Sequence, residues 1–285
     1  MEEQLGAPLE PAVAGTSSRG LTRAALPPWP LWTLFFAIAF VVSGAIVGGL
    51  VFSVLAIAVG AVSGDHFGLK SPGVLLGSTL MQDLAMVAGS LLAVKLAAGR
   101  VRLSDFGFVP VVRRWAAAGL TLLVWVGFLL FTAGWAKLLG EQGHQSLTSE
   151  LGTDRSPALW VGALLLVVIA APLAEEFLFR GLILTVLWRR LGFVGAALIT
   201  GTLFGLLHAG SSSVSLLVPL GVLGVLLCLL RKRTGSLIPC IAAHTLNNSV
   251  AYCSLEHVPA GWFLLIVISA QIVTVGIAVL ISRRA

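Results

Sequence analysis

Long apolar runs occupy most of the chain between residues 31 and 281. A helix needs about 20 predominantly apolar residues to cross the hydrocarbon core of a bilayer. Eight runs approach or exceed that length, at about 31–62, 79–98, 115–139, 158–187, 192–210, 213–230, 235–255 and 260–281. The sequence therefore predicts an all-α membrane protein, folded as a bundle of eight transmembrane helices.

The composition is far from that of a soluble protein. Charged residues make up only 11% of the chain and hydrophobic residues 58%, whereas soluble globular domains contain about 25% charged residues. The net charge of +6 would suggest nucleic-acid binding in a soluble protein, but basic residues that flank apolar runs set membrane orientation. We therefore expect the lipid bilayer as a partner, and no nucleic acid.

The positions of lysine and arginine predict the orientation of the bundle. If the chain has eight spans, both termini lie on the same side of the membrane. Fifteen of the 18 lysines and arginines lie on that side or next to it, and only Lys70, Lys137 and Arg155 lie on the other. Without Lys95 and Arg180, which fall within spans, the ratio is thirteen to three. Because such residues concentrate in cytoplasmic connections, we predict cytoplasmic termini in a multi-pass protein of the plasma membrane.

The first 29 residues differ from the rest of the chain. They are rich in Pro, Ala, Gly, Ser and Glu, a composition typical of disorder. The apolar run that follows is much longer than the roughly 7–15 residues of a signal-peptide core. We predict a disordered cytoplasmic tail over 1–29 and one transmembrane domain over 30–285.

The stretch A-P-L-A-E-E-F-L-F-R, at 171–180, lies inside the fourth apolar run. Each charge at the centre of a membrane helix costs roughly 2.5–3.5 kcal/mol, so ionisable residues at such depth indicate a functional site. Glu176 and Arg180 are four residues apart and can pair, whereas Glu175 is rotated by about 100°. We predict that Glu176 is structural and that Glu175 is available for chemistry, with Pro172 as a natural bend.

Polar residues also interrupt the fifth and seventh runs. Phe204 and His208 share one helix face, as do His244 and Asn248, whereas Asn247 points elsewhere. A lone histidine or asparagine in a membrane helix commonly forms a hydrogen bond to a neighbouring helix, which contributes about 0.6 kcal/mol to stability. However, at 1.5 Å of rise per residue, the polar groups of all three runs reach overlapping depths once tilt is allowed. One shared site is therefore geometrically permitted.

Two weaker signals concern helix packing. Gly201, Gly205 and Ala209 form a stripe of small residues that lets a neighbouring helix backbone come close. Asp83 is the other acid within an apolar run, but it is predicted near the outer end of the second span, where a charge costs less than at the centre. We favour a structural or interfacial role for Asp83 over a position in the site.

A glutamate, two histidines and an asparagine together suit hydrolysis by an activated water. A buried carboxylate can act as a general base or acid, and a neighbouring histidine can help to deprotonate the water. A second histidine with an asparagine supplies donors for a developing oxyanion. The sequence contains neither a G-x-S-x-G nucleophile elbow nor an H-E-x-x-H zinc signature.

The ordered set E-E-x-x-x-R, F-x-x-x-H and H-x-x-x-N resembles the CPBP family over about 160–255. This family comprises the type II CAAX prenyl endopeptidases and related bacteriocin-processing or immunity proteins. The resemblance implies an eight-helix membrane bundle and an intramembrane glutamic-type endopeptidase that needs no cofactor. Its substrate would be a membrane-associated protein or peptide, prenylated or not.

The resemblance also implies a role for each motif residue. Glu175 would activate the water with His208, while His244 and Asn248 would form the oxyanion site. Three further residues would support this catalytic group: Glu176, Arg180 and Phe204.

Two alternatives stay open at this point. Glu175, His208 and His244 could instead be metal ligands of a metal-dependent membrane protease, because carboxylates and imidazoles suit zinc or iron. The chain could also be a non-catalytic membrane immunity or scaffold protein, in which the same polar cluster holds helices together.

Overall fold

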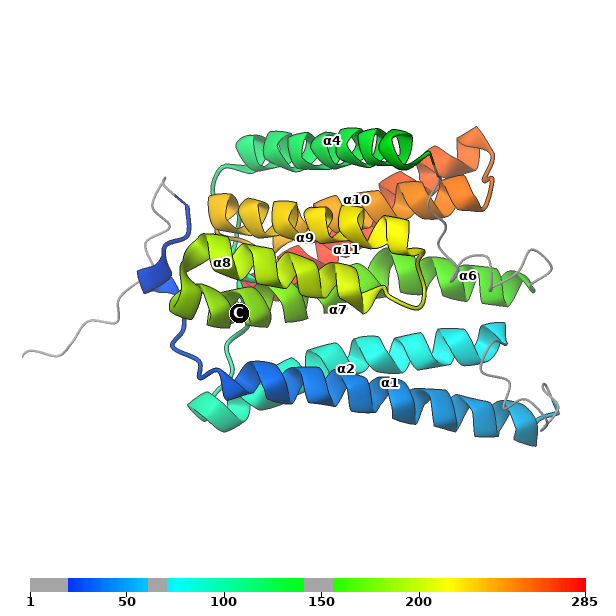
Figure 1. Ribbon diagram of the computed structural model, residues 1–285, viewed down its shortest axis with the longest axis horizontal. Helices are drawn as coiled ribbons and strands as arrows, with labels where there is room; N and C mark the ends of the chain where they lie inside the picture. The colour runs from blue at the N-terminus through cyan, green and yellow to red at the C-terminus, as the bar shows by residue number, and fades with distance from the viewer. Residues whose placement is uncertain (1–19, 61–70, 141–155) are drawn as a thin grey trace, which may run out of the picture.

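The computed structural model describes residues 20–60, 71–140 and 156–285, and these residues are almost entirely helical (Figure 1). The all-α prediction is therefore confirmed for this part of the chain. Six separate long helices are α1 (Trp32–Ala58), α2 (Pro72–Ala98), α4 (Arg114–Leu139), α9 (Val214–Thr234), α10 (Ile238–Leu255) and α11 (Ala260–Arg284). Two short ones are η1 (Arg23–Ala25) and α3 (Leu103–Phe106).

From Pro157 to Leu207 the chain forms one helical stretch in which two π-helical segments interrupt the α-helix. Its parts are, in order, α6 (Pro157–Leu165), η3 (Leu166–Ala170), α7 (Ala171–Glu176), η4 (Phe177–Ile183) and α8 (Leu184–Leu207). Gly192 breaks α8, because its φ of 75° and ψ of 172° are not helical. The chain therefore reverses within α8, and its second half packs against α9 (Figure 1).

Six helices in the described part of the chain are long and apolar enough to cross a membrane. The stretch Pro157–Leu207 counts once among them despite the break at Gly192, and α10, with 18 residues, is not included. The sequence-based count of eight spans, with both termini in the cytoplasm, remains a prediction.

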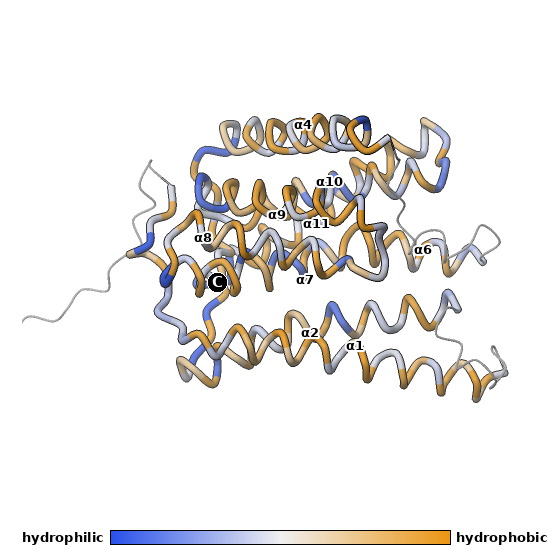
Figure 2. Tube along the Cα trace, in the orientation of Figure 1, coloured by the Kyte–Doolittle hydropathy of each residue, from blue (hydrophilic) through white to orange (hydrophobic). Residues whose placement is uncertain are grey.

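Both described ends of the chain lie at one end of the bundle (Figure 1). The Leu21 amide donates to the Lys232 carbonyl at 2.8 Å, and the Ser104 hydroxyl donates to the Ala285 carbonyl at 3.4 Å. The Arg23 guanidinium donates to the Arg189 carbonyl. We call this the basic end, because it gathers the arginine-rich connections near 99–114, 188–192 and 231–235 and the C-terminus (Figure 2).

Part of the predicted disordered tail is ordered. Residues 1–19 lie outside the described residues, but residues 20–29 pack against the basic end. Arg189 donates to the Leu26 carbonyl at 2.7 Å, and the buried Trp29 ring lies 4.8 Å from that of Phe106. The tail's overall composition hides these contacts of residues 20–29, and the division of the chain near residue 30 stays a prediction.

The segment with the two adjacent glutamates is the most buried part of the fold. Every residue from 174 to 188 is buried, because α2, α9 and α10 surround α7 and η4. A helix that is apolar all round is expected in such a central position. The bundle therefore places the charged stretch at its centre.

Two π-helical segments flank α7. In η3 the Ala171 amide bonds to the Leu166 carbonyl, five residues back, and after η4 the Leu184 amide bonds to the Phe179 carbonyl in the same way. Pro172, which has no N–H to donate, directly follows the wide turn of η3. The irregularity expected near Pro172 is thus a π-helical segment, a feature frequent at functional sites.

Glycines bring α8 and α9 into backbone contact. A Cβ added at Gly205 would lie 2.5 Å from the Leu217 carbonyl oxygen, and one at Gly201 would lie 2.7 Å from that of Gly221. The predicted small-residue stripe is confirmed at these two positions. Ala209 lies beyond the end of α8 and is exposed, so it takes no part in this packing.

We expect Gly205→Val to destabilise the α8–α9 contact by about 1–3 kcal/mol, the usual cost of overpacking. The added side chain meets backbone that cannot move aside. The thermal unfolding of the purified protein in detergent measures the effect. Gly127→Val on α4 is the matched control, because a Cβ there meets nothing within 4 Å; equal losses in both variants would contradict the assignment.

Candidate active site

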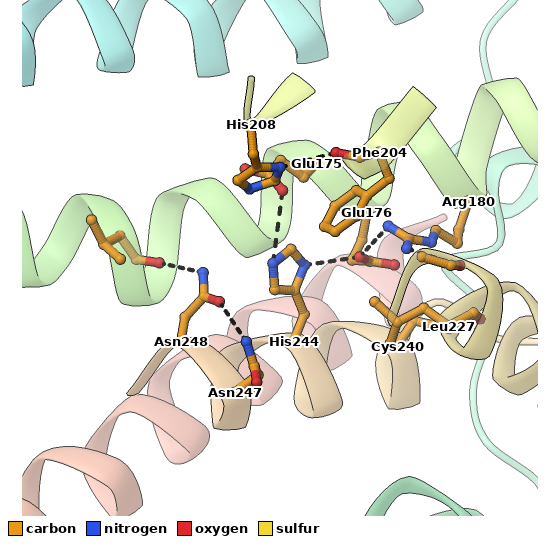
Figure 3. Close-up of polar contacts among 12 residues, drawn as sticks. Glu175, Glu176, Arg180, Phe204, His208, Leu227, Cys240, His244, Asn247 and Asn248 are labelled. Carbon is orange, nitrogen blue, oxygen red and sulfur yellow. Dashed lines mark hydrogen bonds and ion pairs between the residues drawn. The ribbon is translucent and has the colours of Figure 1, made fainter. Parts of the chain in front are cut away.

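Glu176 is the centre of a buried polar network. Its Oε1 accepts from Arg180 Nη1 at 2.7 Å and bonds to His244 Nδ1 at 2.9 Å. Glu176 and Arg180 are fully buried, at 0% exposure. The predicted pair is therefore present, and it also joins α7 to α10 through His244, as Figure 3 shows.

Arg180 and Phe204 complete the network on the side of α8 and α9. Arg180 Nη2 donates to the Gly224 carbonyl at 3.1 Å. The Phe204 ring lies 4.5 Å from the guanidinium carbon and 5.5 Å from the His244 ring. Phe204 therefore packs against both the guanidinium of Arg180 and the ring of His244, and restricts the positions of both groups.

Glu175 lies on the other side of His244 (Figure 3). Its Oε2 is 3.7 Å from His244 Nε2, which is longer than a hydrogen bond. The same oxygen is buried without a hydrogen-bond partner among the described residues. The two adjacent glutamates therefore differ in their partners: Glu176 is paired with Arg180, whereas Glu175 forms no ion pair with an arginine in the described part of the chain. Each of them keeps one buried oxygen without a hydrogen-bond partner among the described residues.

His208 comes from the end of α8, where its backbone leaves the helix. Its Nδ1 lies 2.9 Å from the Phe204 carbonyl oxygen. Because a carbonyl only accepts, Nδ1 carries a hydrogen, and in the neutral ring Nε2 then keeps its lone pair. His208 is thus oriented as a group that can accept a proton.

Asn248 is fixed by the irregular helix that precedes the glutamates. Its Nδ2 donates to the carbonyl of Val167 in η3 at 2.9 Å, and its Oδ1 accepts from Asn247 at 3.4 Å. An amide nitrogen carries two hydrogens, so the second remains available to another acceptor. The prediction that Asn247 points elsewhere is wrong, because it lies beside Asn248 (Figure 3).

One cavity of about 320 Å³ joins these groups. Its lining includes four predicted catalytic residues from α7, α8 and α10: Glu175, His208, His244 and Asn248. The three helices therefore bring together side chains that are separated by up to 73 positions along the sequence.

Residues 157–250 match the sequence family described as type II CAAX prenyl endopeptidase Rce1-like. This stretch belongs to that family. Comparisons with curated proteins and with solved structures gave no match. The match covers all three motifs and confirms the family prediction made from them. The matched family is one of proteases, and the long apolar helices indicate an integral membrane protein.

Asp83 on α2 is the main residue that the sequence interpretation misplaced. It is buried, lines the same cavity, and has an Oδ2 without a hydrogen-bond partner among the described residues. Thr79 and Gln82 line the cavity with it. Their spacing of three and four residues places them on one helix face, and this polar face was the available signal.

The described residues contain no group of three or more His, Cys, Asp or Glu side chains arranged to hold a metal ion. Glu175, His208 and His244, the ligands of the metal-dependent alternative, therefore do not form such a group among the described residues.

Proposed function

We propose that the chain is an intramembrane endopeptidase that hydrolyses a peptide bond of a membrane-associated protein or peptide. The observation that carries this proposal is the cavity at which Glu175, His208, His244 and Asn248 meet. The family of residues 157–250 supports the reaction class. We further propose a plasma-membrane location with cytoplasmic termini, and one transmembrane domain that begins near residue 30.

Glu175 is the general base in this proposal. Its unpartnered Oε2 accepts a proton from a water molecule, and His208 Nε2 accepts a hydrogen bond from the same water. The water oxygen bonds to the carbonyl carbon of the substrate, and the carbonyl oxygen takes the negative charge. General-base catalysis of this kind contributes about 10²–10⁴-fold to a rate.

His244 and Asn248 stabilise the oxyanion. Asn248 donates its second Nδ2 hydrogen, while the first holds the side chain on Val167. His244 donates from Nε2 when its ring is protonated, and the Glu176 carboxylate, which is bonded to Nδ1, compensates the positive charge. Preorganised donors of this type are worth roughly 10²–10³-fold each.

Collapse of the intermediate completes the reaction. The C–N bond breaks, and the proton held by Glu175 passes to the leaving nitrogen. The products are an amine and a carboxylic acid, which then releases its proton to water, so one water is consumed in the hydrolysis and no covalent enzyme intermediate forms. Glu176, Arg180 and Phe204 touch no reacting atom in this scheme; they position His244.

The direct test is the cleavage of a peptide that ends in a CAAX sequence, by the purified full chain in lipid vesicles. A fluorophore and a quencher on either side of the bond after the cysteine report cleavage, and the peptide is supplied with and without a farnesyl group. We expect cleavage by the wild-type protein and by His257→Ala, an exposed histidine outside the cavity. If neither peptide nor a panel of membrane-anchored peptides is cleaved, the proposal is wrong.

Exhaustive chelation separates the two enzyme mechanisms. Glu175 and His208 activate the water in our proposal, so removal of metal should leave the rate almost unchanged. We expect chelation followed by gel filtration to change the cleavage rate by at most about twofold, whereas loss of the group that activates the water would lower it by roughly 10²–10⁴-fold. Loss of cleavage that added zinc or iron restores would favour the metal-dependent alternative.

The non-catalytic alternative makes a different prediction. An immunity or scaffold role would persist in a folded variant with alanine at both Glu175 and His208, whereas cleavage would be abolished. Protection or partner binding that survives this double substitution, in a protein that cleaves nothing, would support the alternative.

A further inference from the structure

A second hollow lies on the opposite side of α10 from the catalytic cavity. It is a groove of about 640 Å³ between α4 and α11, with α10 as its floor. Ala242 and Leu246 of α10 line the groove, whereas His244, two residues from each, lines the cavity. Its volume falls within the roughly 300–1,000 Å³ of small-molecule sites, and it shares no lining residue with the cavity.

The interior of the groove is suited to a hydrocarbon chain. Most lining residues are aliphatic, and the polar ones are hydrogen-bonded within the protein. Thr121 and Ser282 each donate to a carbonyl in the preceding turn of their own helix at 2.8 Å, and Gln271 donates to the Ala242 carbonyl at 3.2 Å. Groups satisfied in this way do not exclude an apolar ligand.

The groove ends in positive charge at the basic end of the bundle. Arg114 begins α4 and Arg283 lies in the last turn of α11, and both line the groove. Neither forms an ion pair with a carboxylate among the described residues. Trp115, next to Arg114, is 91% exposed, as is typical of tryptophans at the level of lipid headgroups.

We propose that this groove binds one anionic phospholipid. The phosphate lies between Arg114 and Arg283, and an acyl chain runs along α10 between α4 and α11. Arginine pairs readily with phosphate through two parallel hydrogen bonds, and basic pockets between membrane helices select anionic lipids. Two unpaired arginines would have no comparable partner in a zwitterionic lipid, whose own amine offsets the phosphate charge.

The lipid would stabilise the helix that carries part of the proposed catalytic site. α10 contacts α11 and α4 directly, and an occupied groove fills the space that separates these two helices. The binding claim itself does not depend on the proposed hydrolysis, because the two hollows are separate. Its test therefore measures lipid binding and not cleavage.

The experiment is native mass spectrometry of the purified full chain with added phosphatidylglycerol or phosphatidylcholine. We expect the wild-type protein to retain one phosphatidylglycerol at least about tenfold more tightly than phosphatidylcholine, and Arg114→Gln/Arg283→Gln to lose about tenfold or more in that affinity. The matched control is Arg113→Gln/Arg284→Gln, which removes the same charge from the adjacent exposed positions outside the groove. This control is expected to bind as the wild type does.

A third variant tests the apolar part of the groove. Ala118 lines the groove and is exposed, so Ala118→Trp fills the space without a change of charge or of the buried core. We expect it to reduce phosphatidylglycerol retention as well. Equal losses in both arginine pairs, equal retention of the two lipids, unchanged binding by Ala118→Trp, or a dimer in place of a lipid adduct would each overturn the proposal.

Discussion

Replacing Glu176 with glutamine is expected to lower the free energy of unfolding by about 3–5 kcal/mol. The carboxylate accepts from Arg180 and bonds to His244 at a site with no exposure to solvent. Glutamine has nearly the same shape, but it leaves the buried guanidinium without its counter-charge. Removal of one partner of a buried ion pair is strongly destabilising for this reason.

Unfolding by SDS in mixed micelles measures this effect. The control is Glu176→Gln/Arg180→Met, which removes both charges and should recover much of the lost stability, because apolar replacements of buried pairs are often neutral or stabilising. The control should still cleave poorly, since His244 loses the carboxylate that orients it. A fully stable Glu176→Gln variant would show that the pair does not hold the bundle centre together.

The spacing of residues within one helix allowed part of the site to be predicted. Glu176 and Arg180 had to share a face because they are four residues apart, and the structure shows that ion pair. The same argument separated Glu175 from the arginine. These are local consequences of helical geometry, so they need no knowledge of how the helices pack.

Contacts between helices could not be predicted in this way. The position of His244 between the two glutamates depends on how α10 packs on α7. The bond from Asn248 to Val167 depends on the π-helical turn of η3, whereas Pro172 had indicated only a bend. Asn247 was misplaced because one helix face was assumed to serve one cavity.

Asp83 and residues 20–29 show a second limit. The depth of Asp83 was judged from the estimated ends of a span, but packing against α7 buries it beside the cavity. The packing of residues 20–29 against the basic end depends on apolar side chains within a polar segment. In both cases a local average of the sequence missed a tertiary contact.

The central claim is that Glu175 activates the attacking water, and the most direct measurement is the cleavage rate of Glu175→Gln. Glutamine keeps the size of the side chain but cannot take the proton. Glu175 is not paired with an arginine, so this variant should stay folded, in contrast to Glu176→Gln. Its SDS unfolding curve confirms this in the same preparation.

With the peptide reporter, in vesicles of equal protein content, we expect Glu175→Gln to cleave about 10²–10⁴-fold more slowly than the wild type. His257→Ala, measured alongside, should cleave at the wild-type rate. Such a loss in a folded protein is the result that the account predicts. Cleavage by folded Glu175→Gln at the wild-type rate would contradict it.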